Sequence, residues 1–292
     1  MTAKILCIIG PTASGKSARA IEEALGRNGE IISVDSRQVY RGLDIGTEKI
    51  SKEEMRNVPH HLIDILDVNE PYSAGDFVAD ASRLIGEIAT RGKLPVLVGG
   101  THFYFDALLH GLPEGTPPDP KLREELEVLN TVELYTRVRQ ADPRRARELD
   151  PHNRRRLVRA LEIIAAHGSV PLRKSPLSFP VGINSGHAFL PYHIEWIVTD
   201  LPREELRARI DARLESALAR GLVEEVQHVR EQVGDARLNE LGLEYRVVGE
   251  HLRGERTRES LIPAISAKLW QYARHQKAWI RKLHVEAVEE RR

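Results

Sequence analysis

Apolar and polar positions alternate along the first hundred residues in blocks that predict strands and helices in turn. Short apolar runs, typical of buried strands, occur at Lys4–Ile9, 30–34, 61–66 and 94–98. Between them, residues 16–25 and 74–91 show the spacing of amphipathic helices. Strands that alternate with helices favour a parallel sheet with helices packed against it. This part of the chain is therefore predicted to form an α/β core.

The middle of the chain departs from this alternation. Residues 113–120 are rich in Pro and Gly, which indicates a boundary, and 121–168 show a charged helical pattern. Residues 169–191 have little periodicity and are expected to form an irregular return connection before a strand pattern resumes at His193–Val198. We therefore predict a core in two parts, 1–115 and 191–292, with a helical insertion over 116–190. Residues 203–283 are expected to be helical, with breaks at Gly221, Gly242 and Gly254.

Composition excludes several classes of protein. The single cysteine, Cys7, lies in an apolar run, so neither an intramolecular disulfide nor a cysteine-ligated zinc cluster is available. We expect Cys7 to be a small core residue. The N-terminal apolar run is too short for a secretory segment, and no later run approaches a membrane span. A cytoplasmic location is expected, with no membrane partner and no obligate protein partner evident.

Charge is balanced overall but uneven along the chain. Lys and Arg number 43 and Asp and Glu also number 43, so the net charge gives no general signal for nucleic acid. Residues 136–160, however, contain nine Arg and three acidic residues, and 260–285 contain no acidic residue. Helical spacing groups these charges into two basic faces: Arg155, Arg156 and Arg159 on one, and Arg274, Lys277 and Arg281 on the other. Solvated helix faces and RNA-binding faces both remain possible interpretations.

A phosphate-binding motif lies between the first strand and the first helix. Residues 10–17 satisfy G-x-x-x-x-G-K-[ST], in which glycines let backbone amides converge on phosphate oxygens. Lys16 adds a mobile positive charge, and the Ser17 hydroxyl can reach a phosphate-bound Mg²⁺. The candidate phosphate ligands are Gly10, Thr12, Ala13, Ser14, Gly15, Lys16 and Ser17. The motif predicts an α/β protein with a P-loop, nucleotide-kinase-like parallel sheet core and an inserted helical subdomain.

Polar residues at the ends of other strands are further candidates. Asp35 and Asp64 each follow an apolar run, and Thr101 follows Gly99 and Gly100 at the end of another. Parallel strands direct their carboxyl ends toward the ligand crevice. Either aspartate could hold Mg²⁺, act as a base or cap a loop, and Thr101 could be a hydroxyl donor or part of a turn.

Five motifs in order then make the sequence recognisable. They are GPTASGKS at 10–17, SVDSRQVY at 33–40, DIGT at 44–47, YSAGDF at 72–77 and LVGGT at 97–101. Together they resemble the tRNA dimethylallyltransferase family. The resemblance continues through 153–162, 221–226 and 274–281, so it covers nearly the whole chain.

The resemblance implies that dimethylallyl diphosphate, rather than ATP, occupies the P-loop, with Mg²⁺ as cofactor. The N6 amine of the adenosine just 3′ of the anticodon of tRNA would attack the allylic carbon. It also implies catalytic roles for Lys16, for Asp35 as acceptor of the N6 proton, and for Thr101 at the leaving oxygen. Arg209 would bind the diphosphate. Ser36, Arg37, Gln38 and the two basic faces would contact tRNA.

One stretch departs from the family pattern, and alternative functions remain. The segment Gly242-Leu243-Glu244-Tyr245-Arg246 differs from the shorter Gly-Tyr-Arg of many members, so tRNA contacts by Tyr245 and Arg246 are not predicted. The alternatives are a P-loop small-molecule kinase, a prenyltransferase acting on free AMP or ADP, and a non-catalytic RNA-binding P-loop protein.

Overall fold

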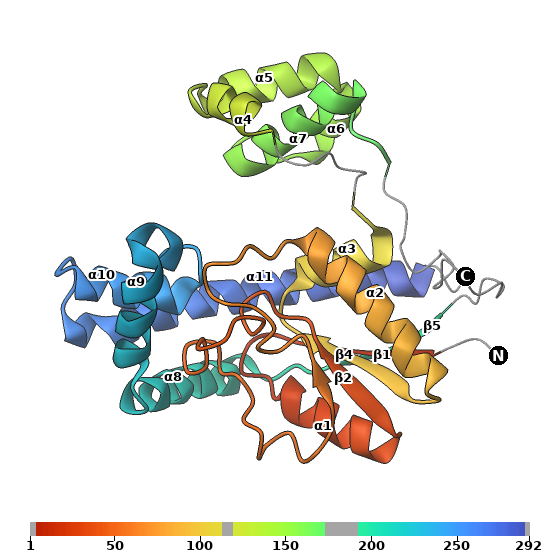
Figure 1. The fold of residues 1–292 in the computed structure, drawn as a ribbon, viewed down its shortest axis with the longest axis vertical. Helices are drawn as coiled ribbons and strands as arrows, with labels where there is room; N and C mark the ends of the chain where they lie inside the picture. Colours follow the sequence, from red (N-terminus) through yellow and green to blue (C-terminus); the bar gives the residue numbers. More distant parts are fainter. Residues whose placement is uncertain (1–3, 113–118, 173–191, 290–292) are drawn as a thin grey trace. The chain divides into compact units, whose positions relative to one another are not determined.

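The computed structural model describes residues 4–112, 119–172 and 192–289. These residues divide into two compact units (Figure 1), one within 1–106 and 177–292 and the other within 107–176. The predicted domain boundaries, at 115/116 and 190/191, and most of the predicted return connection lie outside the described residues. The predicted domain limits therefore stay a prediction.

The first unit is built on a parallel sheet in the order β3-β2-β4-β1-β5. Its strands are β1 (Lys4–Ile9), β2 (Gly29–Ser33), β3 (His60–His61), β4 (Leu94–Gly99) and β5 (His193–Val198). Every pair in the sheet is parallel, so the carboxyl ends of β1, β2 and β4 meet at one edge. The predicted parallel α/β core is confirmed.

The strand predicted over 61–66 is wrong beyond His61. Leu62 and Asp64 have left-handed backbone angles, with φ of 62° and 55°, which an extended strand does not permit. Only an isolated bridge between Tyr40 and Leu66 continues the pairing. Leu62 is buried, at 4% exposed, but Asp64 and Ile65 are exposed, so the segment is a partly buried loop.

Successive strand residues point to opposite faces of the sheet, and residues 5–9 of β1 are all buried, so both faces must be covered. The helices of the first half are α1 (Lys16–Gly26), α2 (Ala74–Thr90) and α3 (His102–His110). Leu6 and Ile8 of β1 share a buried cluster with Ile21 of α1, so α1 covers their face. Cys7 faces the other way and is buried, and burial raises the pKa of its thiol well above its usual range. Cys7 is confirmed as a small core residue.

The rest of the first unit is helical. It contains α8 (Arg203–Ala219), α9 (Leu222–Leu238), α10 (Leu243–Leu252), the 3-10 turn η2 (Arg258–Ser260) and α11 (Leu261–Glu289). The predicted glycine breaks are confirmed: Gly221 and Gly242 directly precede α9 and α10, and Gly254, with a φ of 77°, follows α10. Figure 1 shows α11 as the longest element, with α8 and α10 packed against it.

The second unit is a small helical bundle. It consists of α4 (Pro120–Glu127), α5 (Thr131–Ala141), α6 (Pro143–Glu148) and α7 (Arg154–His167). Leu134, Val138 and Leu157 are fully buried in its own apolar core. Asn130 begins α5 with a capping box and Asn153 caps α7, which fixes where these helices start. The predicted helical character of this segment is confirmed.

No helix in the described part of the chain is both long enough and apolar enough to cross a membrane.

A buried carboxylate ties the amino end of β2 to its neighbours. Glu30, with a side chain 5% exposed, pairs with His61 at 2.8 Å, Arg91 at 2.7 Å and Lys93 at 2.9 Å. Burial alone would raise the pKa of Glu30, but hydrogen bonds from Lys93, His61 and Arg91 outweigh it and lower the pKa to about 2. The cluster lies at the amino end of β2, whereas Asp35 follows the carboxyl end, so we infer that the cluster stabilises the fold.

Glu30→Gln is expected to lower the free energy of unfolding by about 1 to 3 kcal/mol at pH 7, because His61, Arg91 and Lys93, which are partly exposed, lose their anionic hydrogen-bond partner. The depressed pKa makes this contribution complete above the unfolded-state pKa and lost as pH falls from about 4.5 toward about 2. Urea unfolding between pH 7 and pH 3 measures the difference. Glu87→Gln is the control, since Glu87 pairs with Arg83 in solvent and should contribute under about 1 kcal/mol. Equal losses in both variants would contradict the assignment.

Candidate active site

A cavity of about 560 Å³ opens at the carboxyl ends of β1, β2 and β4. Its wall combines four parts of the first unit: the loop after β1, the loop after β2, the corner after β4 and the helices from α8 to α11. Among the predicted site residues, Thr12, Ala13, Gly15, Lys16, Ser17, Asp35, Ser36, Arg37, Gln38 and Thr101 line it. Asp64 does not. It pairs instead with Lys49 and stabilises the loop that replaces the predicted strand.

The loop between β1 and α1 forms a nest of backbone amides. Ala13 and Gly15 have φ of 62° and 82°, and left-handed residues within such a loop turn successive N–H groups toward one point. Among the described residues, the N–H groups of Ala13, Gly15, Lys16 and Ser17 have no backbone acceptor. The amino end of α1 adds a partial positive charge, so the loop is suited to an anion with several oxygens.

Two motif residues support this loop from behind rather than line the cavity. A Cβ at Gly10 would lie 2.1 Å from Thr199 Oγ1, so only glycine fits there. Ser14 is 7% exposed and its hydroxyl is 2.7 Å from Thr199 Oγ1. Gly10 and Ser14 are predicted diphosphate ligands that do not line the cavity, and their contact with a diphosphate stays a prediction. Both anchor the loop to the segment after β5.

Lys16 lies inside the nest. Its Nζ donates to the carbonyl of Pro11 at 3.1 Å. Burial, with a smaller contribution from the Arg213 guanidinium, lowers the pKa of Lys16 to about 8, and Asp35 partly offsets this. A bound phosphate would place a negative charge beside this ammonium group and so would raise its pKa and favour its charged form.

Asp35 and Thr101 meet across the ends of β2 and β4. Asp35 Oδ1 accepts the backbone N–H of Arg37 at 2.8 Å and of Gln38 at 3.3 Å, which fixes the carboxylate and leaves Oδ2 for a ligand. The Thr101 hydroxyl oxygen accepts the N–H of Ser36 at 3.1 Å, so its own hydrogen remains available to a ligand oxygen. The structure therefore places a carboxylate and a hydroxyl donor side by side.

Gln38 closes one wall of the cavity. Its amide nitrogen donates to the carbonyl oxygens of Thr47 and Glu48 at 3.2 and 3.4 Å, and its amide oxygen accepts the hydroxyl of Ser33 at 3.2 Å. The polar atoms of the Gln38 side chain are therefore bonded within the protein. Its neighbours Ser36 and Arg37 also line the cavity, and their side chains make no hydrogen bond within the described part of the structure.

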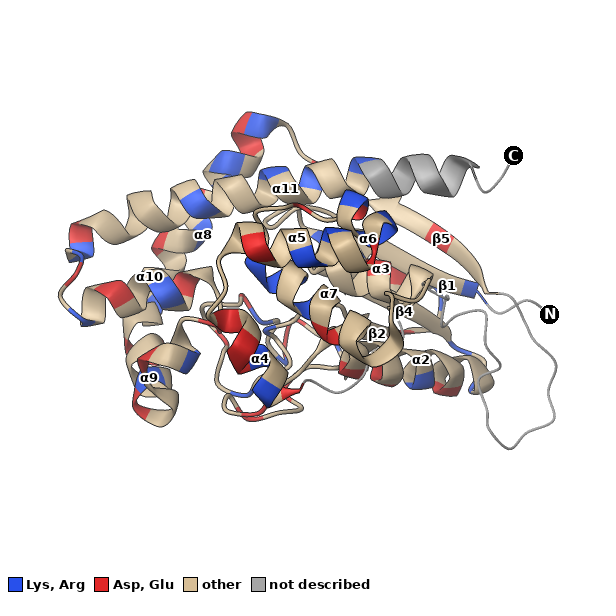
Figure 2. Cartoon of the chain, turned by 90° about the horizontal axis from the view of Figure 1, so that it is seen from above, with Lys and Arg blue, Asp and Glu red and all other residues tan. Residues whose placement is uncertain are grey.

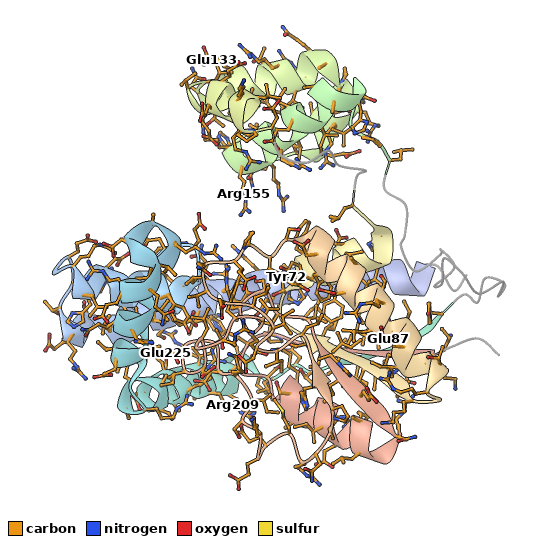
Figure 3. All side chains as sticks on the ribbon, in the orientation of Figure 1. Tyr72, Glu87, Glu133, Arg155, Arg209 and Glu225 are labelled. Carbon is orange, nitrogen blue, oxygen red and sulfur yellow. The ribbon has the colours of Figure 1, made fainter. Side chains whose placement is uncertain are left out.

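The arginine assignment on α8 changes. Arg209 lies 3.8 Å from the position of a Cβ on Gly15 but does not line the cavity, and it pairs with Glu205 at 2.9 Å (Figure 3). Arg213, one helical turn later, lines the cavity and faces Lys16. The spacing of four on one helix is the signal that would have found it.

The cavity wall also includes residues of α10 and α11 that the motifs did not reveal: Glu244, Lys268, Leu269, Tyr272 and Gln276. Burial raises the pKa of Glu244, and the neighbouring Asp35 adds to this, whereas Arg213 opposes it. Leu243 and Glu244 are the two residues by which this segment exceeds the shorter Gly-Tyr-Arg of many family members. Nothing in the sequence placed Glu244 opposite Asp35.

Tyr245 is a packing residue and not a surface residue. It is 1% exposed, its hydroxyl donates to Glu225 at 2.7 Å, and its ring fills the space beside Gly46. The same carboxylate of Glu225 (Figure 3) accepts the N–H groups of Asp44, Ile45 and Gly46 and so holds the loop that lines the cavity. Arg246, in contrast, is exposed and lines the cavity.

Residues 261–281 of α11 include basic residues and no acidic ones, as Figure 2 shows. Arg274 and Arg281 are exposed. Lys277 differs, since it is 21% exposed, pairs with Asp200 at 2.7 Å and donates to the carbonyl of Leu201. Lys277 therefore fastens α11 to the segment before α8. The ring of Trp279 stacks on that of His102, with centroids 4.7 Å apart, so Trp279 packs α11 against the start of α3.

In the second unit, the arginines of α7 have different surroundings. Arg154 caps the end of α4 by donating to the carbonyls of Leu126 and Glu127, and Arg159 pairs with the buried Glu162 at 2.9 Å. Arg155 and Arg156 are exposed, and among the described residues they form no ion pair or side-chain hydrogen bond. Figure 3 shows Arg155 projecting outward from α7.

The fold and the cavity define an α/β protein with a P-loop-like strand-loop-helix unit beside a carboxylate. The family model for IPP transferase matches residues 38–283. The chain is 43% identical over 286 residues to the tRNA dimethylallyltransferase of Thermomicrobium roseum, covering 96% of this chain and 84% of the relative. It is 41% identical to tRNA dimethylallyltransferase 1 of Trichlorobacter lovleyi, with 96% and 92% covered. The chain belongs to the IPP transferase family.

Solved structures agree with this assignment. The full-length tRNA isopentenylpyrophosphate transferase of Bacillus halodurans is 36% identical, with a TM-score of 0.68 and 95% of this chain and 86% of that chain covered. A eukaryotic dimethylallyltransferase acting on tRNA is 28% identical, with a TM-score of 0.78 and 96% and 70% covered.

Proposed function

We propose that this enzyme transfers a dimethylallyl group from dimethylallyl diphosphate to N6 of the adenosine immediately 3′ of the anticodon in tRNA, releasing diphosphate. The observation that carries the proposal is the position of Asp35 and Thr101 beside the amide nest in one cavity. Family membership and the names of the relatives support the transfer of a prenyl group to tRNA. The identity of the donor and the modified position are part of this proposal.

In the proposed reaction, the bond between the allylic carbon and the bridging oxygen breaks as the bond from N6 forms. The carbon develops a resonance-stabilised positive charge, so the main task is to stabilise negative charge on the departing diphosphate. The amides of Ala13, Gly15 and Ser17, together with Lys16, face that charge. Thr101 donates its hydroxyl hydrogen to the leaving oxygen. The proton released from N6 passes to Asp35, since an exocyclic amine is a poor nucleophile until it begins to lose that proton.

The resemblance assigned Arg209 to the diphosphate, and we propose that Arg213 has this role instead. Arg213 lines the cavity near Lys16, whereas Arg209 lies against Gly15 outside it. A guanidinium group binds two phosphate oxygens at once, which suits the outer end of a diphosphate.

Magnesium is the proposed cofactor. Among the described residues, no group of three or more His, Cys, Asp or Glu side chains is arranged to hold a metal ion. Mg²⁺ retains waters and is commonly held by substrate phosphates with one or two protein oxygens, so a single hydroxyl is a suitable donor set. Ser17 is exposed in the cavity and would hold the ion with the diphosphate. Bound there, Mg²⁺ would neutralise charge on the leaving group.

The exposed arginines support tRNA as the acceptor. Arg155 and Arg156 occupy the first turn of α7, where the helix dipole disfavours positive charge by about 0.3 to 1 kcal/mol for each residue. Neither has an acidic partner among the described residues, so an anionic ligand such as a phosphate backbone is the natural counter-charge. An adenosine stacked in a loop reaches the cavity only when it is flipped out, as is usual for enzymes that act on bases.

The decisive assay uses radiolabelled dimethylallyl diphosphate with Mg²⁺ and one co-substrate at a time: tRNA, AMP, ADP or ATP. Label is expected in tRNA alone, and a tRNA with guanosine at the position 3′ of the anticodon should remain unlabelled. Label in AMP or ADP would identify a prenyltransferase of free nucleotides. Transfer of the γ-phosphoryl group of ATP without prenyl transfer would identify a kinase.

The exposed arginines allow a separate test of tRNA binding. The double variants Arg155→Gln/Arg156→Gln and Arg274→Gln/Arg281→Gln are each expected to weaken tRNA affinity and to reduce the slope of log K against log salt by about 2. Filter binding from 50 to 300 mM salt measures both quantities. The matched control is Lys52→Gln/Arg258→Gln, which removes two exposed charges elsewhere. Variants with the control's affinity and slope would identify these faces as solvated surface.

A further inference from the structure

A buried amide side chain joins the two corners of the cavity. Gln276 of α11 is 2% exposed. Its Oε1 accepts the backbone N–H of Thr12 at 2.8 Å, and its Nε2 donates to the carbonyl of Gly100 at 2.9 Å. Thr12 belongs to the loop after β1 and Gly100 to the corner after β4, so a single side chain bridges the carboxyl ends of two adjacent strands.

The surroundings are shaped to this amide. A Cβ at Gly100 would lie 2.8 Å from Gln276 Nε2, so the corner requires glycine for the amide to approach. Tyr272, one turn earlier on α11, also donates to the carbonyl of Gly100, at 3.2 Å. The bridge needs one acceptor and one donor on a neutral group, which Gln provides and Glu, when ionised, does not.

The bridge bears on the chemistry because of what its two ends carry. Thr12 begins the amide nest that leads to Lys16, and Gly100 directly precedes Thr101. The position of a Cβ on Gly100 is 3.9 Å from Lys16 Nζ, so the two corners approach each other closely at this point. The bridge also commits the Thr12 N–H to the protein, which leaves the amides of Ala13, Gly15, Lys16 and Ser17 for a ligand.

We propose that Gln276 is a positioning residue that holds the phosphate-binding loop and the corner bearing Thr101 at the separation that a bound diphosphate requires. This inference rests on the proposed function, since it takes diphosphate as the ligand of the loop. Gln276 touches neither reacting atom and acts through Thr12 and Gly100. Its helix also carries Arg274 and Arg281, so it connects the predicted tRNA-facing helix directly to the loop.

The test measures the binding of inorganic diphosphate with Mg²⁺ by isothermal titration calorimetry, which requires neither prenyl transfer nor tRNA. Gln276→Ala is expected to weaken diphosphate binding about tenfold or more, on the scale of lost positioning. Affinity for tRNA without donor is expected to remain that of the wild type. Gln271→Ala, an exposed change on the same helix, is the control.

Gln276→Glu separates positioning from packing, because it has nearly the same shape. At high pH its carboxylate opposes the carbonyl of Gly100, and binding should be weak. As pH falls, the protonated carboxyl regains both a donor and an acceptor, so diphosphate affinity relative to wild type at the same pH should recover. Gln276→Ala should show no such recovery.

Two results would overturn the inference: a diphosphate affinity of Gln276→Ala equal to that of the control, or a Gln276→Glu affinity with no dependence on pH relative to wild type. Either leaves the proposed function in place. Failure of the wild type itself to bind diphosphate would instead overturn both proposals. Since Gln276→Glu keeps the side-chain volume, this comparison stands even where Gln276→Ala folds poorly.

Discussion

Asp35→Asn is expected to lower the single-turnover rate of prenyl transfer by about two orders of magnitude or more, the scale of a positioned general base. The turn that holds the side chain should survive, because an Asn oxygen can accept the N–H groups of Arg37 and Gln38 as Asp35 Oδ1 does. The substitution removes only the ability to take the N6 proton. Affinities for tRNA and for dimethylallyl diphosphate should therefore remain close to those of the wild type.

The experiment combines rapid-quench measurement of the rate with separate measurement of both affinities across a Mg²⁺ series. Asp64→Asn is the matched control, since Asp64 also follows an apolar run but lies outside the cavity. Weak donor binding that added Mg²⁺ restores would identify Asp35 as a metal ligand, as in a kinase. A near-normal rate would remove Asp35 from the mechanism.

Lys16→Ala is expected to lower the turnover of prenyl transfer by about 10² to 10³, because one preorganised positive group facing the leaving diphosphate is lost. Binding of tRNA without donor should not change, since Lys16 lies within the amide nest and its Nζ contacts the carbonyl of Pro11. Wild-type turnover at saturating donor would contradict the role of Lys16. Lys52→Ala, which changes an exposed lysine, is the control.

The lowered pKa of Lys16 predicts that the affinity for diphosphate depends on pH. Burial lowers the pKa of Lys16 to about 8, so in the free enzyme its positive charge is present below pH 8 and lost above it. Diphosphate affinity should accordingly fall as pH rises through about 8, and binding above that pH should take up a proton. Calorimetry in buffers of different ionisation enthalpy measures the uptake. Part of the pH dependence comes from the ionisation of diphosphate itself. Lys16→Ala should keep that part and lose the rest.

The pattern of the sequence determined the parts of the fold that depend on neighbouring residues. The apolar run of β1, the glycines and Lys16 of the following loop, and the start of α1 are contiguous, so their interactions are local. The glycine breaks among the C-terminal helices are predictable for the same reason, because glycine tolerates the left-handed angles seen at Gly221 and Gly254. The apolar run at 61–66 misled because Leu62 and Asp64 adopt left-handed backbone angles, which exclude a strand and which the apolar pattern does not reveal.

Site residues near the strand ends were likewise found from the sequence, since parallel strands present their carboxyl ends to one crevice. Asp35 and Thr101 are examples, and both line the cavity. The phosphate-binding motif did not distinguish the residues that line the cavity from those that hold the loop in place. Ser14 belongs to the motif, yet its hydroxyl contacts Thr199, 185 residues away in the sequence.

Only the tertiary structure decided what closes the cavity. Arg213, Glu244 and Gln276 come from α8, α10 and α11, and the contact between Gln276 and Thr12 spans 264 residues. Such a contact leaves no periodic or local signal, because it depends on how α11 packs across the ends of β1 and β4. The sequence by itself therefore determined the phosphate loop, the carboxylate and the family resemblance. Long-range packing decided which arginine enters the cavity, which carboxylate faces Asp35 and which amide holds the two corners together.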